Sequence, residues 1–147
     1  MLKIDVGLKT GDGPLLKGTC HCGAAGWTLD QTPEAATTCN CTICRRYGVI
    51  WAYGYIGHNI QTTGQTNTYR RSASGDGDID FHFCATCGCV THYVATTTNE
   101  DSRYWTAVNL RMSDPVPIND IPINHFEGHE SFKDLPRDGK TIRDVWF

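Results

Sequence analysis

Residues 39 to 48 of this 147-residue chain read Cys39-Asn40-Cys41-Thr42-Ile43-Cys44-Arg45-Arg46-Tyr47-Gly48. Two more cysteine clusters flank this stretch, Cys20-His21-Cys22 before it and Cys84-Ala85-Thr86-Cys87-Gly88-Cys89 after it. Disulfides within such short clusters would close very small loops, whereas a CxxC turn aims two thiolates at one metal ion. The N-terminal residues lack the apolar core of a signal peptide, so we expect a cytoplasmic protein with reduced thiols. The eight cysteines therefore predict metal ligands rather than disulfides.

The expected metal is zinc. Thiolates select zinc, copper(I) or iron–sulfur clusters, and the CxxCxxC spacing followed by Cys-Pro that is typical of the clusters is absent. Gly88 directly follows Cys87, where a tight backbone turn can point N–H groups at sulfur, as in a zinc knuckle.

Spacing alone leaves the division of the cysteines between sites open. The pairs Cys41/Cys44 and Cys84/Cys87 can share one ion, with the remaining four cysteines in a second site. Alternatively, the first CxC joins the Cys84/Cys87 pair, and Cys39, Cys41 and Cys44 form a compact triad.

The order CxC, CxCxxC, CxxCG extends into a longer pattern. It consists of Gly18-Thr19-Cys20-His21-Cys22-Gly23-Ala24, the stretch from Cys39 to Gly48, Thr68-Tyr69-Arg70 and Phe83-Cys84-Ala85-Thr86-Cys87-Gly88, with weaker matches at Val108-Asn109-Leu110 and around His129. Over about residues 15 to 115 this pattern resembles the glutathione-dependent formaldehyde-activating family, which includes centromere-protein-V-like domains. The resemblance implies a mainly β chain with little helix, built as a single domain over residues 1–147. Its small layered antiparallel sheets, of the β-tent type, would surround cysteine-ligated zinc.

The resemblance also implies a role for seven cysteines and two zinc ions. By position, the structural ligands would be Cys20, Cys22, Cys84 and Cys87, and the functional, catalytic ligands would be Cys39, Cys41 and Cys44. Four thiolates close a tetrahedron, whereas three leave one position open for water or substrate. Cys89 is not part of the family pattern, and we expect a buried free thiol there.

Alternating apolar and polar residues predict seven strands. They are Leu15 to Thr19, Ala25 to Leu29, Val49 to Ile56, Thr66 to Arg71, Ile79 to Phe83, Cys89 to Ala95 and Tyr104 to Leu110. One short helix is expected around Thr42 to Tyr47. From Asp114 onward, four prolines predict loop and sheet edge.

Turns are predicted at Gly11–Pro14, at Thr63-Gly64 and at Ser74–Asp78. The last of these carries Asp76 and Asp78 but lacks the closing Glu of a calcium loop, so we expect a solvated hairpin tip.

Two basic pairs, Arg45-Arg46 and Arg70-Arg71, are either solvent-facing charges or anchors for an anionic substrate, because guanidinium groups bind carboxylates bidentately. We favour Arg45 and Arg46 as anchors for a substrate carboxylate, since they lie beside the CxCxxC cluster.

Aromatic residues and histidines allow similar alternatives. Trp51, Tyr53 and Tyr55 share one face of a predicted strand, where they pack in the core or line a pocket. Of the six histidines, His82 is the best candidate to approach a metal site, two residues before Cys84.

Charge and motifs exclude several classes of function. A net charge of −3 and a pI near 6.0 argue against nucleic-acid binding. The sequence contains no run of 18 apolar residues, so no membrane span is predicted. The sequence carries no serine-hydrolase elbow, P-loop or dinucleotide fingerprint.

The resemblance implies a zinc-dependent carbon–sulfur lyase that reversibly adds a small-molecule thiol, glutathione, to a small aldehyde, formaldehyde, to form an S-hydroxymethyl thioether. The alternative is a non-enzymatic, zinc-stabilised binding module. Thiol redox chemistry is a third hypothesis, which zinc ligation would block.

Overall fold

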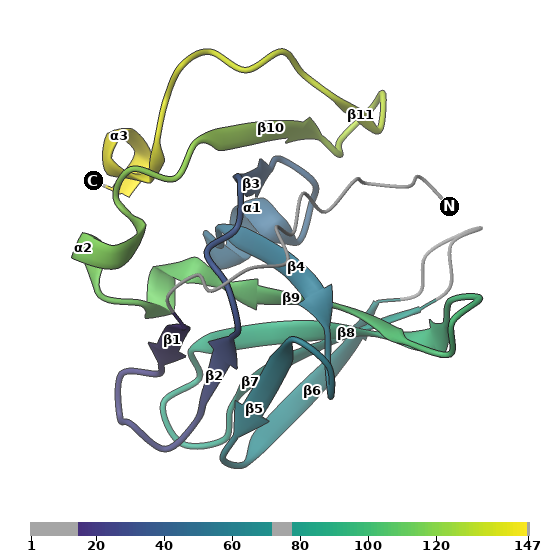
Figure 1. The fold of residues 1–147 in the computed structure, drawn as a ribbon. Coiled ribbons are helices and arrows are strands. Elements are labelled where there is room, and N and C mark those ends of the chain that lie inside the picture. The colour runs from purple at the N-terminus through teal and green to yellow at the C-terminus, as the bar shows by residue number, and fades with distance from the viewer. Residues whose placement is uncertain (1–14, 72–77, 147) are drawn as a thin grey trace.

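The computed structural model of this chain describes residues 15–71 and 78–146. Its strands form a three-stranded sheet of order β1-β2-β5 and an eight-stranded sheet of order β11-β10-β3-β4-β9-β8-β7-β6 (Figure 1). The small sheet contains β1 (Leu16–Thr19), β2 (Gly26–Leu29) and β5 (Ile60–Thr63). The large sheet contains β3 (Ala36–Cys39), β4 (Trp51–Tyr55), β6 (Thr66–Arg71), β7 (Ile79–Cys84), β8 (Val90–Thr98), β9 (Tyr104–Asn109), β10 (Ile123–Glu127) and β11 (Lys133–Asp134).

The helical segments are short. They are α1 (Cys44–Tyr47), the 3-10 turn η1 (Leu110–Met112), α2 (Pro115–Ile118) and α3 (Ile142–Trp146). α1 ends at Gly48, whose left-handed φ of 65° suits glycine and whose N–H bonds the Cys44 carbonyl. In the part of the chain that the structure describes, no helix is long and apolar enough to span a membrane.

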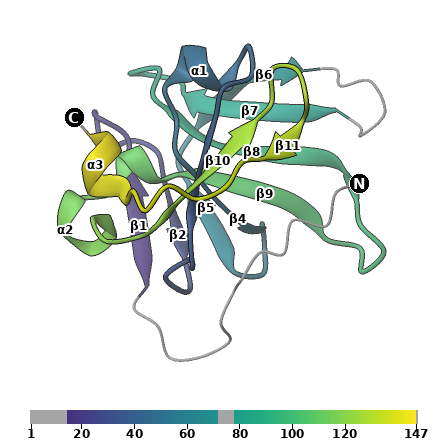
Figure 2. The same cartoon turned by 90° about the horizontal axis from the view of Figure 1, so that it is seen from above.

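The small sheet packs on one face of β4 and β9. Trp27, Leu29 and Ile60 from the small sheet join Ala52 and Val108 in one buried cluster. The same cluster takes in Ile118 of α2 and Ile142 of α3, and these two helices lie together on one side of the molecule in both views (Figures 1 and 2). This core holds the small sheet against the large sheet, and a separate buried cluster packs Cys20 and Ala25, in the turn between β1 and β2, against Cys84.

The opposite face of the large sheet carries an aromatic cluster. Trp51 packs edge-on against Tyr93, with ring centroids 4.9 Å apart, and Phe81 lies 5.5 Å from Tyr93. Tyr53 stacks on Trp105 at 5.0 Å. The expected sharing of one strand face is confirmed: Trp51 and Tyr53 lie in the same cluster as Cys41 and Cys44, and Tyr55 packs edge-on against the Trp105 ring on which Tyr53 stacks.

The predicted fold class, mainly β with little helix, is confirmed. Antiparallel pairing holds at every described strand pair except one, since β10 lies parallel to β3. The seven predicted strands correspond to β1, β2, β4 and β6 to β9, and the predicted helix corresponds to α1 with a later start.

Four strands were not predicted: β3, β5, β10 and β11. The expectation of only loop and edge after Asp114 is therefore wrong for β10, which lies inside the sheet between β3 and β11, and for the short helices α2 and α3. Strand β3 has the sequence Ala-Thr-Thr-Cys, with no alternating apolar pattern, and becomes a strand through its pairing with β4 and β10. The predicted turns at Gly11–Pro14 and at residues 74–77 lie outside the described residues.

Candidate metal centres

The first cysteine cluster is built by two turns that come together from distant parts of the chain. Cys20 follows β1, and its turn is closed by a hydrogen bond from the Cys20 N–H to the Ala25 carbonyl, 2.8 Å. Cys84 ends β7, and the Gly88 N–H bonds the Cys84 carbonyl at 3.0 Å. Gly88 has a φ of 78°, the left-handed conformation that a glycine adopts without strain, as expected for a knuckle turn.

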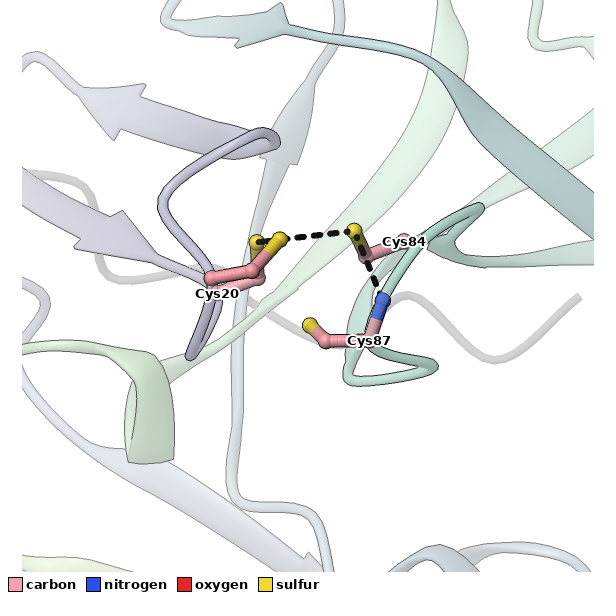
Figure 3. Close-up of side chains that lie close together, drawn as sticks. Cys20, Cys84 and Cys87 are labelled. Carbon is pink, nitrogen blue, oxygen red and sulfur yellow. Dashed lines mark hydrogen bonds between the residues drawn. The ribbon is translucent and has the colours of Figure 1, made fainter.

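The four sulfurs of this cluster fit a tetrahedral thiolate site. Those of Cys20, Cys22, Cys84 and Cys87 all lie within 4.8 Å of one another. Cys22 Sγ is 3.6 Å from both Cys20 Sγ and Cys84 Sγ. Zinc–sulfur bonds of about 2.3 Å in a tetrahedron place sulfurs about 3.8 Å apart, close to these separations. Figure 3 shows the sulfurs of the labelled residues facing a common centre.

Backbone N–H groups point at the sulfurs. The Ala25 N–H donates to Cys20 Sγ at 3.3 Å, and the Thr86 N–H donates to Cys84 Sγ at 3.4 Å. Hydrogen bonds from the backbone of Cys87 and Thr86 lower the pKa of Cys84. Bonds from the backbone of Cys22 and Cys89 lower the pKa of Cys87 to about 5. The thiolate, which is the form that binds a metal, is therefore favoured at both positions.

The second cluster is a triad. Cys39 ends β3, Cys41 lies in the following turn and Cys44 begins α1, and their sulfurs also lie within 4.8 Å of one another. Among residues 15–71 and 78–146, no fourth His, Cys, Asp or Glu ligand atom joins them. The donor set suits a soft metal ion and leaves one tetrahedral position open, which is the arrangement of catalytic rather than structural zinc.

Hydrogen bonds also shape the triad. The Cys41 N–H donates to Cys39 Sγ and the Cys44 N–H donates to Cys41 Sγ, each at 3.4 Å. The indole N–H of Trp51 donates to Cys44 Sγ at 3.3 Å. Interactions with the thiols of Cys39 and Cys44 lower the pKa of Cys41, so negative charge in the triad is favoured there.

The triad borders a largely dry region. Burial raises the pKa of both Tyr53 and Tyr93 above the ordinary value of a tyrosine, as expected for phenols in a low-dielectric environment. Tyr93 is buried, and its hydroxyl accepts a bond from the Trp105 indole at 3.2 Å. Electrostatic interactions at the triad are strengthened by this low-dielectric side.

The two basic pairs end in different environments. Arg45 and Arg46 are both exposed on α1, and Arg46 Nη1 donates to the Thr42 carbonyl at 2.7 Å. Arg46 also lines a cavity of about 610 Å³ together with Arg111, which the sequence analysis did not single out. Arg70 is committed to a bidentate ion pair with Asp80, at 2.8 and 2.9 Å.

His82 and Cys89 stay outside both sulfur groups. His82 Nδ1 hydrogen-bonds Thr66 Oγ1 at 2.8 Å, and its ring stacks on His92 with centroids 4.2 Å apart. No histidine joins either cluster within the described residues. Cys89 is a free, half-buried cysteine that lines the same cavity as Arg46.

Sequence reasoning missed two contributors to the triad. Trp51 was considered only as a core or pocket aromatic, although its N–H reaches Cys44. Asn40, between two of the cysteines, joins the triad turn to β10 and the residue after it. The only feature of the sequence that could have pointed to Asn40 is its position as a polar residue between the two cysteines of a CxC motif.

Comparison with known proteins agrees with this geometry. Residues 15–115 match the family model described as glutathione-dependent formaldehyde-activating enzyme. A search of curated proteins found no significant match. Because the matched region covers more than half of the chain and includes every cysteine of the two sulfur clusters, this chain belongs to the glutathione-dependent formaldehyde-activating enzyme family.

Proposed function

We propose that this protein is a zinc-dependent carbon–sulfur lyase that reversibly adds glutathione to formaldehyde. The observation that carries the proposal is the contrast between the two clusters, one with four sulfurs and one with three. In this proposal Cys20, Cys22, Cys84 and Cys87 hold a structural zinc, while Cys39, Cys41 and Cys44 hold a functional zinc. When bound at the triad, zinc supplies a Lewis acid that stabilises a thiolate or a developing alkoxide.

The chemistry balances without a further reactant. The thiol sulfur forms a bond to the carbonyl carbon, the C=O π pair moves to oxygen, and the thiol proton ends on that oxygen. Addition of a thiol to formaldehyde is intrinsically easy, so the protein mainly orients the reactants. Around the triad, the N–H donors of Cys41, Cys44 and Trp51 hold the sulfurs in place, and the buried aromatic cluster excludes water from one side.

In this proposal the carboxylates of glutathione bind in the cavity beside α1, which Arg46 and Tyr47 line. No triad cysteine lines this cavity, but Tyr47 packs against the cluster that contains Cys41 and Cys44. The cavity volume of about 610 Å³ is in the range of small-molecule sites.

Arg46 and Arg111 supply two positive charges, and glutathione carries two carboxylates. Arg111 donates to the carbonyls of Val145 and Trp146 through its two Nη atoms, and Arg46 uses one Nη on Thr42. Each guanidinium has five N–H donors, so both retain donors for a carboxylate.

The test compares exchange between free formaldehyde and its glutathione adduct by NMR, with wild type, Cys41→Ser and buffer. Wild type should exceed buffer, and Cys41→Ser should return the rate to that of buffer. Equal rates in all three would refute the lyase. Saturable thermal stabilisation by glutathione without faster exchange would favour the binding module instead.

The anchor is tested separately. Arg46→Ala should raise KM for glutathione about tenfold with little change in kcat, because a charged hydrogen bond contributes about 1.5 kcal/mol or more. Arg45→Ala, on the same helix but outside the cavity lining, is the matched control and should leave KM unchanged.

A further inference from the structure

Asn40 joins the triad turn to the end of strand β10. Its Nδ2 donates to Glu127 Oε1 at 3.1 Å, and its Oδ1 accepts from the Gly128 N–H at 2.8 Å. Parallel pairing of β3 with β10 places Phe126 opposite Cys39, so the chain after Phe126 runs beside the chain after Cys39. The hydrogen bonds of the Asn40 side chain thus extend the contact between the two chain segments beyond the end of the β3–β10 pairing.

The side chain of Glu127 holds the loop that follows β10 together through hydrogen bonds. Its carboxylate accepts from the N–H groups of His129, Glu130 and Ser131 and from the Ser131 hydroxyl, in addition to Asn40. Bonds from Ser131 lower the pKa of Glu127 to about 2, so the carboxylate is ionised at neutral pH. One anion therefore organises the whole segment Glu127–Ser131, which we call the β10–β11 loop.

Gly128 places this loop directly against the triad. A Cβ added at Gly128 would lie 2.8 Å from Cys39 Sγ and 2.9 Å from the Cys41 Cβ, too close for any side chain. The backbone of Gly128 therefore covers the Cys39 side of the triad. Trp51, by contrast, contacts the triad at Cys44, through the hydrogen bond that its indole N–H donates to the Cys44 sulfur. The loop lies beyond residue 115, where the match to the family model ends, although the sequence around His129 weakly resembles the family pattern.

We propose that the β10–β11 loop is a wall of the three-cysteine site, and that Asn40 and Glu127 are positioning residues that hold it over Cys39. The inference rests on the proposed function in so far as the triad holds a metal. The wall slows release of that metal and restricts access to Cys39. Groups that orient metal ligands from outside typically change metal affinity about tenfold or more when removed.

The test measures metal loss from the purified holoprotein to an excess of chelator, with the two sites followed by native mass spectrometry. Glu127→Gln removes the anion that collects the loop, and Asn40→Ala removes the bridge itself. Each should speed metal loss from the triad about tenfold and leave the four-cysteine site unchanged. Glu130→Gln, an exposed carboxylate in the same loop, is the matched control and should behave as wild type.

A second measurement keeps the wall separate from the proposed function. With the triad free of metal, iodoacetamide labelling of Cys39 should rise about tenfold in Asn40→Ala and Glu127→Gln, whereas labelling of Cys89 should not change. A triad that never holds metal, with this labelling pattern intact, would refute the proposed function and support the wall. The wall would be overturned if both variants left the labelling of Cys39 and the rate of metal loss from the triad unchanged. It would also be overturned if metal loss rose equally at both metal sites and the labelling of Cys89 rose with that of Cys39.

Discussion

Loss of the four-cysteine site should be far more damaging to the fold than loss of the triad. The perturbation is Cys84→Ser, with Cys44→Ser as the matched control. Both cysteines are buried, at 1% and 7% exposed, so the change in packing is similar. The difference lies in how much chain each metal cross-links.

The magnitude follows from loop closure. Cys22 and Cys84 are 62 residues apart, and a cross-link over a loop of that length is worth about 4 kcal/mol of chain entropy. The triad lies within Cys39–Cys44, and a cross-link that short is worth about 2 kcal/mol. Small domains are stable by about 5–15 kcal/mol in total. Because binding energy at a structural metal is also folding energy, Cys84→Ser loses more than the entropy alone.

Urea unfolding at a fixed zinc concentration, followed by far-UV circular dichroism, measures both variants. We expect Cys84→Ser to lower the free energy of unfolding by at least about 4 kcal/mol, a loss large enough to abolish the cooperative transition. Cys44→Ser should lower it by about 2 kcal/mol and keep a cooperative transition. The reasoning would be refuted by equal losses in the two variants, or by Cys84→Ser unfolding within about 1 kcal/mol of wild type.

Three further changes test other parts of the structure. Burial lowers the pKa of His92 to about 3, so between pH 6.5 and 3 the unfolded chain binds the extra proton. This one group should lower stability by about 1.4 kcal/mol from pH 7.5 to 5.5, and the stacked His82, whose pKa burial also lowers, adds to the fall. His92→Gln should remove most of that fall in urea unfolding, and an unchanged slope would be contrary evidence. Trp51→Phe removes the N–H donor to Cys44 and should speed metal loss from the triad about fivefold, and a wild-type rate in the chelator assay would show that the bond is unimportant. Gly54→Ala would place a Cβ 2.6 Å from Asn59 Oδ1 and should cost about 1–3 kcal/mol in thermal unfolding, whereas an unchanged Tm would contradict the crowding.

Most strands were predictable because their signals are local. β1 alternates buried and exposed residues, and β4 carries a run of aromatics on one face. β3 and β10 lack so clear a signal, and each is a strand partly because the other lies beside it. No pattern within a short window reports a parallel partner more than 80 residues away.

Some residues of the candidate site were likewise predictable from local sequence, whereas others were not. The cysteine clusters stand out by spacing alone, because CxC and CxxC are turns that aim neighbouring sulfurs at one point. Arg111, which joins Arg46 at the cavity, directly follows the weak family match Val108-Asn109-Leu110, but nothing in that stretch marks Arg111 itself as a site residue. Its place follows from the packing of η1 against the rest of the fold.

The amino-acid sequence by itself determined that this is a mainly β chain with three thiolate turns, since alternation and turn spacing act over a few residues. Which turns share a site was left open by spacing. The tertiary structure decided it by carrying Cys20 and Cys22, after β1, to Cys84 and Cys87, after β7. It also brought Asn40 to Glu127, 87 residues later. Contacts of this kind depend on the order in which strands pair, which is set by burial of the whole core and not by any one segment.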